Sequence, residues 1–149
     1  MDAAQPWWSG TVIYQLIVRS YADGNGDGIG DFKGLASRLP YLRWLGVKTL
    51  WLTPVYPSPL RDGGYDITAF NDIHPDLGDL ASFHRFLTAA HGQGMQVILD
   101  LVLNHTSDLH PWFQRARWAA KDSPERNVYV WSDDPVSYTH LTLPTNSRV

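Results

Sequence analysis

The hydrophobic residues of this chain fall into two kinds of segment. Short apolar runs rich in β-branched and aromatic residues predict strands, and they are TVIYQLIV at 11–18, VKTLWLTPV at 47–55 and MQVILDL at 95–101. Between these runs, apolar residues recur every three or four positions, which predicts amphipathic helices. The expected order of elements is therefore β-α-β-α-β.

Two segments carry the helical spacing: the first has Leu35, Leu39, Leu42 and Leu45, and the second has Phe83, Phe86, Leu87 and Ala90. Pro40 is expected to interrupt the first helix, because proline has no N–H to donate and its ring crowds the preceding turn. Gly46 is expected to end that helix. Asp79 is expected to cap the start of the second helix, and Gly92 and Gly94 to end it.

The strands are apolar throughout rather than alternating, which favours a parallel sheet covered by helices. A doubly wound sheet and a (β/α)8 barrel both begin with this order of elements. Two features favour the barrel: no Gly-x-Gly-x-x-Gly follows the first strand, and long polar loops follow the strands at 19–31, 53–79 and from 102 onward. The predicted fold class is α/β, comprising the first three βα units of a (β/α)8 TIM barrel, which needs about 250 residues when complete.

Composition and charge exclude several classes of function. The net charge is −3 and no basic cluster is present, so we expect no nucleic-acid partner. The absence of cysteine excludes disulfides, thiolate zinc sites and cysteine nucleophiles. The first residues, MDAAQPWWSG, do not have the features of a signal peptide, and no apolar run is long enough to span a membrane. We therefore expect a cytoplasmic protein without a membrane partner.

The stretch ADGNGDGIGDF, residues 22–32, carries oxygen-bearing side chains at alternate positions. Oxygen ligands at alternate positions are the pattern of the first part of an EF-hand calcium loop. The corresponding ligands here are Asp23, Asn25, Asp27, the carbonyl of Ile29, and Asp31. Gly34 stands where an EF-hand has its bidentate glutamate. The pattern predicts a structural Ca²⁺ or Mg²⁺ site, and the alternative is a turn-rich loop in which Asp31 only caps a helix.

Two further groups of residues are candidates for sugar binding. Asp100 stands at the end of the third predicted strand, and Asn104 and His105 follow it, at the end of the sheet where barrel enzymes place their chemistry. Tyr65 and Asp66 lie in the long second loop and combine an aromatic ring with a carboxylate. The ring can pack on a pyranose and the carboxylate can accept hydrogen bonds from hydroxyls. A Tyr-Asp pair in a loop is, by itself, more often structural.

Four motifs in order resemble the N-terminal part of the α-amylase superfamily of glycoside hydrolases. They are VIYQLIVRSYADGNGDGIGDFKGL, GYDI, DLVLNHTSDLHPWF and YVWSDDP. The resemblance covers residues 7 to about 135 and is greatest to the branch that contains trehalose synthases and α-glucosidases. It implies a small-molecule sugar as substrate, such as maltose, trehalose or another α-glucoside.

The resemblance also implies roles for individual residues. Tyr65 would stack on a glucose ring, Asp66 and His105 would hydrogen-bond that glucose, and Asp100 would support the site from the strand end. The loop from Asp23 to Asp31 would match the metal loop of this branch. Asn104 occupies the position that ligates a second calcium in many family members.

The chemistry of the family is retaining and uses two carboxylates, one as nucleophile and one as acid and then base. The resemblance places both beyond this chain, so the 149-residue polypeptide is expected to be inactive, poorly folded or aggregation-prone. It divides the chain into barrel residues 1–102, the start of an inserted domain B at 103–135, and a tail at 136–149. That tail, VSYTHLTLPTNSRV, has no acidic residue and is interpreted as non-native.

Three functions remain open for the protein that contains this chain. The first is conversion of maltose to trehalose by intramolecular glucosyl transfer. The second is hydrolysis of α-glucosides by an α-glucosidase or oligo-1,6-glucosidase. The third is a non-catalytic module that binds sugar or calcium, because function depends on a complete site and not on the fold.

Overall fold

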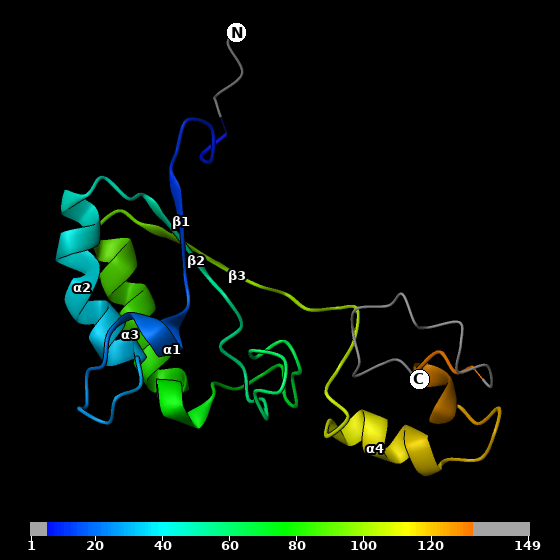
Figure 1. The fold of residues 1–149 in the computed structure, drawn as a ribbon. Coiled ribbons are helices and arrows are strands. Elements are labelled where there is room, and N and C mark those ends of the chain that lie inside the picture. The colour runs from blue at the N-terminus through cyan, green and yellow to red at the C-terminus, as the bar shows by residue number, and fades with distance from the viewer. Residues whose placement is uncertain (1–5, 133–149) are drawn as a thin grey trace, which may run out of the picture. The chain divides into compact units, whose positions relative to one another are not determined.

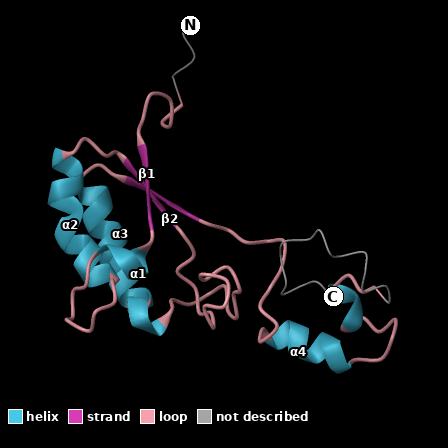
Figure 2. Ribbon diagram, viewed as in Figure 1, coloured by secondary structure: helices cyan, strands magenta, loops and turns pink. Residues whose placement is uncertain are grey.

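Three short parallel strands form one sheet in the order β1-β2-β3. Figure 1 labels these strands, and Figure 2 draws strands in magenta. The strands are β1 at Ile13–Leu16, β2 at Thr49–Leu52 and β3 at Gln96–Leu99. Leu16 lies opposite Leu52, and Leu52 lies opposite Leu99. Parallel neighbours require a crossover connection, and a helix supplies it in each case. The predicted α/β class, the β-α-β-α-β order and the parallel sheet are confirmed in this computed structural model, which describes residues 6–132.

Four α-helices and two short 3₁₀ helices complete the described residues: α1 at Val18–Tyr21, α2 at Phe32–Trp44, η1 at Pro75–Leu77, α3 at Leu80–Gly92, α4 at Pro111–Trp118 and η2 at Arg126–Val128. None of the helices in residues 6–132 is long and apolar enough to cross a membrane. The tail expected at 136–149 lies outside the described residues, as do the last residues of the YVWSDDP motif.

The chain divides into two compact units. One comprises Met1–Val55 and Ile73–Asp100, and the other comprises Tyr56–Asp72 and Leu101–Val149. The first unit contains the sheet with α1, α2 and α3, and the second contains α4 and the loop that follows β2. The division into a barrel part and an inserted domain at residue 102 stays a prediction.

Helix α2 runs unbroken through Pro40, so the expected interruption is wrong. Pro40 has no N–H to donate to the carbonyl of Ala36, which weakens one turn of the helix. Tertiary packing compensates, because Leu35, Leu39 and Leu42 are fully buried on the face that the helix turns to the core. Leu45, which was expected on the same face, is 49% exposed because it follows the last helical residue.

Helices α2 and α3 end in the same way. Gly46 and Gly94 have φ angles of 88° and 77°, a region that glycine enters without steric cost. In each case the glycine and the residue after it donate their N–H groups back to the last turn of the helix. Asp79 starts α3 in a capping box with Ser82. The predicted ends at Gly46 and Gly94 and the predicted cap are confirmed, whereas Gly92 is still helical.

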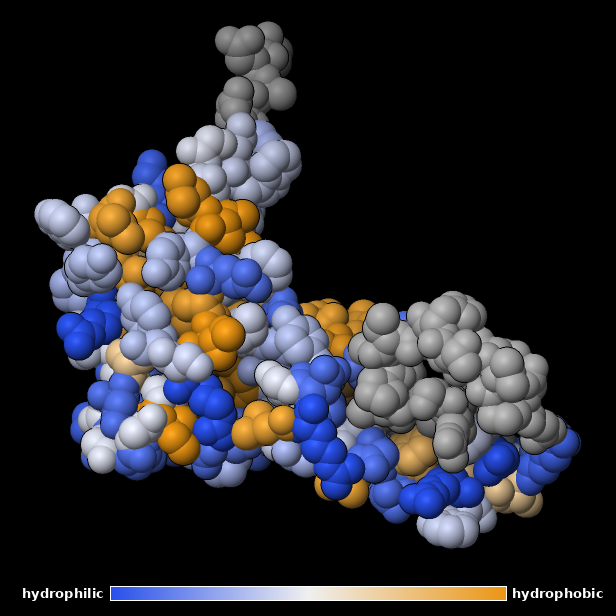
Figure 3. Space-filling model, in the orientation of Figure 1, coloured by the Kyte–Doolittle hydropathy of each residue, from blue (hydrophilic) through white to orange (hydrophobic). Residues whose placement is uncertain are grey.

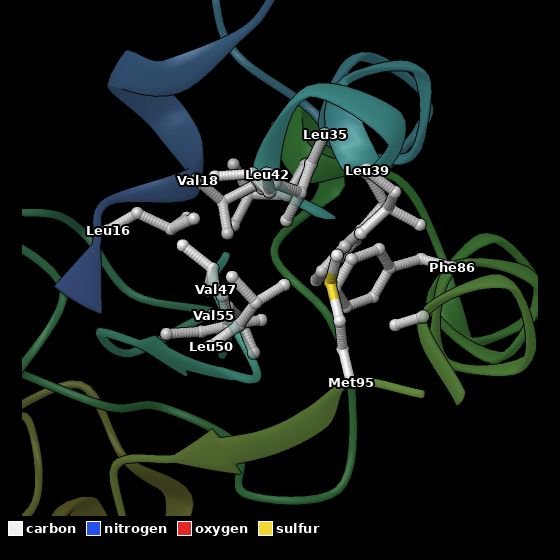
Figure 4. Close-up of a cluster of buried hydrophobic side chains, with 14 of the residues drawn as sticks. Leu16, Val18, Leu35, Leu39, Leu42, Val47, Leu50, Val55, Phe86 and Met95 are labelled. Atoms are coloured by element: carbon white, nitrogen blue, oxygen red, sulfur yellow. The ribbon is translucent and has the colours of Figure 1, made fainter. Parts of the chain in front are cut away.

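The core lies between the sheet and the helices, as Figure 4 shows. Leu50 and Val47 face Leu39 and Leu42 of α2, and Phe86 enters from α3. The first strand is shorter than expected, because the chain turns into α1 at Val18 and buries that side chain in the same core. All of these residues belong to the first unit.

The strands are not buried on both faces, which corrects the expectation for β3. Ile13 is 45% exposed, Trp51 is 37% exposed, and Val97, Ile98 and Leu99 are only half-buried. Figure 3 shows orange hydrophobic areas reaching the surface among blue hydrophilic ones. These strand residues are exposed because α2 and α3 cover only one face of the sheet. No described element of the first unit covers the opposite face.

We predict that Leu39→Ala destabilises the protein by about 2–5 kcal/mol, because it removes a fully buried side chain and leaves a cavity. The matched control on the same segment is Leu45→Ala, which should change stability by no more than about 0.5 kcal/mol. Urea unfolding of the two variants in the full-length protein measures the difference. Equal losses for both would contradict the packing described here.

Candidate functional site

The acidic loop connects α1 to α2 and is organised by hydrogen bonds from its own backbone. The carboxylate of Asp23 accepts N–H bonds from Asn25 at 3.0 Å, from Gly26 at 2.6 Å and from Gly28 at 2.7 Å. The bond from Gly28 contributes most to lowering the pKa of Asp23, followed by the bond from Gly26. Asp23 is therefore a carboxylate at neutral pH.

The other acidic-loop side chains repeat this arrangement. Asn25 Oδ1 accepts the N–H of Asp27 at 2.9 Å, and Asp27 Oδ1 accepts the N–H of Ile29 at 2.7 Å. Asp31 is buried, and its two oxygens accept N–H bonds from Gly34 and from Gly24. The first of these caps α2, so the helix cap that the sequence analysis held as an alternative does form.

The acidic loop has the donor chemistry of a site for a hard cation, namely carboxylate, amide and carbonyl oxygens. Each oxygen that accepts one N–H bond keeps a second lone pair. Within residues 6–132, however, no group of three or more His, Cys, Asp or Glu side chains is assembled around a common point. The metal ligands named from the sequence therefore stay a prediction.

Asp66 organises the loop that follows β2. Its Oδ1 accepts the hydroxyl of Ser58 at 2.5 Å, and its Oδ2 accepts the N–H of Arg61 at 3.0 Å. The residue is fully buried, so in this arrangement the carboxylate is closed to solvent. Leu60, between the two donors, has a φ of 60°, which is strained for a non-glycine residue. Asp66 is thus at least a structural anchor of this loop.

The ring of His105 contacts both Tyr65 and Asn104. Its Nε2 lies 3.2 Å from the carbonyl oxygen of Tyr65, and its Nδ1 lies 3.3 Å from Nδ2 of Asn104. Because a carbonyl only accepts and an amide nitrogen only donates, the ring proton belongs on Nε2. A further bond, from the N–H of Ser107 to the carbonyl of Ile67, joins the same two segments.

Asp100 lies immediately after β3 in the first unit. Its N–H donates to the carbonyl of Leu52 at 3.2 Å, which extends the β2–β3 ladder by one residue. Its carboxylate accepts the indole N–H of Trp51 at 2.6 Å. Asp100 is predicted from its motif whereas Trp51 is not, although the parallel register places the two residues on one face.

Sequence reasoning also missed Ser58 and Arg61 as partners of Asp66. Arg61 bonds to Asp66 through its backbone N–H, and its guanidinium forms an ion pair with Asp108 at 3.2 Å. This ion pair joins the loop to the segment after β3. No periodic signal marks these contacts, since they depend on how an irregular loop closes on itself.

His110 is a buried side chain that caps α4. Its Nδ1 accepts the N–H of Trp112 at 3.1 Å, so the ring must be unprotonated at that atom. Burial lowers the pKa of His110, and the positive charge of Arg115 lowers it further. The ring also packs on Phe70 and Trp112.

The family model for the alpha amylase catalytic domain matches residues 15–148. A trehalose synthase of Pimelobacter sp. is 51% identical over 132 residues, which are 89% of this chain and 23% of that protein. An oligo-1,6-glucosidase of Parageobacillus thermoglucosidasius is 48% identical over 125 residues, which are 84% of this chain and 22% of that protein. The chain therefore spans less than a quarter of the length of either relative.

Among solved structures, the trehalulose synthase MutB has a closely similar fold. Two crystal structures of MutB mutants, one in complex with glucose and one in complex with Tris, each superpose with a TM-score of 0.82 at 45% identity. Each superposition covers 86% of this chain and 23% of the MutB chain. This similarity agrees with the α/β class and with a fragment of a TIM barrel.

We predict that acidification weakens α4 through His110. Because the folded pKa lies below the unfolded value of 6.5, this group stabilises the fold above pH 6.5, and that contribution is lost as the pH falls toward the folded pKa. His110→Asn keeps an acceptor at the cap and does not titrate, so it should remove this pH dependence. Amide hydrogen exchange of α4 between about pH 5 and pH 7.5, corrected for intrinsic rates, measures the effect.

The matched control is His91→Asn, at an exposed histidine near the end of α3. It should leave the pH dependence of α4 protection unchanged. If His110→Asn retains the full pH dependence, His110 is not its source.

Proposed function

The chain belongs to the α-amylase catalytic-domain family, and we propose that it is the N-terminal segment of a trehalose synthase. Such an enzyme converts maltose to trehalose by moving a glucosyl group from one hydroxyl of glucose to another. The observation that carries the proposal is the identity of about half of all aligned residues with a trehalose synthase along most of this chain. A small-molecule sugar is accordingly the proposed partner.

In this proposal, Tyr65, Asp66 and His105 hold the glucose that is transferred. The Tyr65 ring would pack on the apolar face of the pyranose. His105 donates its Nε2 proton to the Tyr65 backbone, and this bond would fix the orientation of the loop that presents the tyrosine. The contact supports the assignment because it joins two motifs that lie 40 positions apart in sequence.

Asp66 would accept hydrogen bonds from two sugar hydroxyls. Both of its oxygens already accept one bond each, and the residue is buried, so a sugar could reach it only if the loop around Ser58 opened. The positive φ of Leu60 favours such a movement, because it stores strain that a rearranged loop would release.

The bond-breaking groups lie outside the described residues in this proposal. One carboxylate would attack the anomeric carbon while a second donates a proton to the departing oxygen, and the second would then deprotonate the incoming hydroxyl. Asp66 is bonded to Ser58 of its own loop and Asp100 to Trp51 of the neighbouring strand, and neither is assigned to these roles. A chain that holds only the binding residues would not turn over sugar.

A second candidate is an oligo-1,6-glucosidase or α-glucosidase. The similarity to an oligo-1,6-glucosidase is nearly as high as that to the trehalose synthase. Such an enzyme would use the same glucose-binding residues and transfer the glucosyl group to water. The two functions differ in the fate of the glucosyl group and not in how this chain would hold it.

We also propose that the acidic loop holds a structural Ca²⁺ or Mg²⁺. Asp23, Asn25, Asp27, the carbonyl of Ile29 and Asp31 would be the ligands, and a bound cation would cross-link the connection between α1 and α2. The chemistry of the donors and the ionised state of Asp23 support the proposal. Asn104 would hold a second cation through its Oδ1, because its Nδ2 is turned toward His105.

We predict that the full-length protein converts maltose to trehalose with free glucose as a minor product. Chromatography of the sugars after incubation with maltose measures the ratio of the two. Glucose as the main product would support the glucosidase candidate instead. The absence of either product, together with measurable heat of sugar binding, would support a non-catalytic module.

The isolated 149-residue chain serves as the control in the same assay. It should show no turnover, because the proposal places both reacting carboxylates elsewhere. Turnover of maltose by this chain would overturn the assignment of its residues to binding alone.

We predict that Ca²⁺ or Mg²⁺ raises the thermal midpoint of the chelator-treated full-length protein, because a cation that binds only the folded state stabilises it by mass action. Asp27→Asn should reduce this increase, since it removes one charged ligand. Asp122→Asn is the control, because Asp122 is an exposed acid outside the loop and asparagine tolerates its φ of 66°. Equal increases in both variants would place the cation elsewhere.

A further inference from the structure

The register of the parallel sheet places Trp51 and Asp100 on the same face. Trp51 of β2 lies opposite Ile98 of β3. Asp100 comes two residues after Ile98, just past the end of β3. Side chains two positions apart in a strand point to the same side. The helix-facing neighbours Leu50 and Leu52 are fully buried in the core, so Trp51 and Asp100 belong to the face that α2 and α3 leave uncovered.

The indole of Trp51 makes a direct, directional contact with Asp100. Its Nε1 lies 2.6 Å from Oδ1 of the carboxylate. An indole nitrogen can only donate, so the carboxylate oxygen is the acceptor and the direction of the bond is unambiguous.

We propose that Trp51 is a positioning residue for Asp100. Trp51 is part of the regular strand β2, and its indole N–H reaches the carboxylate of Asp100 just past the end of β3. It holds the carboxylate of Asp100 in one orientation at the carboxyl edge of the sheet. The role rests on the proposed function, because it takes up the supporting role in sugar binding that the resemblance to the α-amylase superfamily implies for Asp100.

A packing role for Trp51 predicts a different pattern of effects. If Trp51 only filled space, its replacement by phenylalanine would act independently of the residue at position 100. If Trp51 acts through Asp100, removing the indole N–H and removing the carboxylate should have overlapping effects. A double-mutant cycle separates these cases, because residues joined by one interaction show non-additive effects.

The experiment compares Trp51→Phe, Asp100→Asn and the double variant in the full-length protein. Trp51→Phe keeps an aromatic ring and loses the donor. It should lower kcat/KM for the glucosyl reaction with maltose about tenfold or more, mainly through kcat, because a displaced supporting group costs transition-state alignment. In the Asp100→Asn background the same substitution should cost less than about threefold.

Trp44→Phe is the matched control. Trp44 is 79% exposed on α2 and its ring contacts Tyr41, so the same chemical change should leave kcat and KM unchanged. Additive effects of Trp51→Phe and Asp100→Asn on kcat/KM would overturn the positioning role. So would a Trp51→Phe variant with full activity.

A second measurement does not depend on the reaction. The indole N–H resonance of Trp51, identified as the one absent from Trp51→Phe, should shift in Asp100→Asn, whereas the resonance absent from Trp44→Phe should not. An unshifted Trp51 resonance would overturn the proposed action of Trp51 on Asp100, even if the protein is an active trehalose synthase. A shifted resonance in a protein that forms neither trehalose nor glucose would support the Trp51–Asp100 contact and reject the proposed function.

Discussion

The parallel pairing of β2 with both of its neighbours is the constraint on which the rest of the structure depends. Because β1, β2 and β3 run in one direction, their carboxyl ends lie along one edge of the sheet. The return paths must then cross over on a face, and α2 and α3 both cover the same face. Residues that follow a strand, such as Asp100, therefore start from the edge where parallel-sheet enzymes place their sites.

The two faces of the sheet have different chemistry as a consequence. The helix-covered face carries Leu16, Leu50 and Leu52 and closes a wholly apolar core. The other face carries Trp51 with its polar contact to Asp100 and is partly exposed in a chain less than a quarter as long as its relatives. A closed barrel turns such a face inward, where layers of side chains fill the interior. In a closed barrel, the exposed hydrophobic residues of β1 to β3 would lie on that inward face.

Features that depend on neighbouring residues are the ones best predicted from the sequence, and the interruption expected at Pro40 is the exception. The cap at Asp79 and the helix ends at Gly46 and Gly94 follow from short-range hydrogen bonds and backbone preferences. The expected interruption at Pro40 is wrong, because burial of the leucines on α2 outweighs one missing hydrogen bond. The bonds of Ser58 and Arg61 to Asp66 could not be predicted, since they depend on a loop conformation that no periodicity specifies.

The acidic loop shows why capping and cation binding are not mutually exclusive. Three carboxylates in so short a segment repel one another, and the N–H groups bonded to Asp23, Asp27 and Asp31 offset that repulsion. The same bonds hold the side chains against the backbone, so the proposed cation would cost less side-chain entropy to ligate.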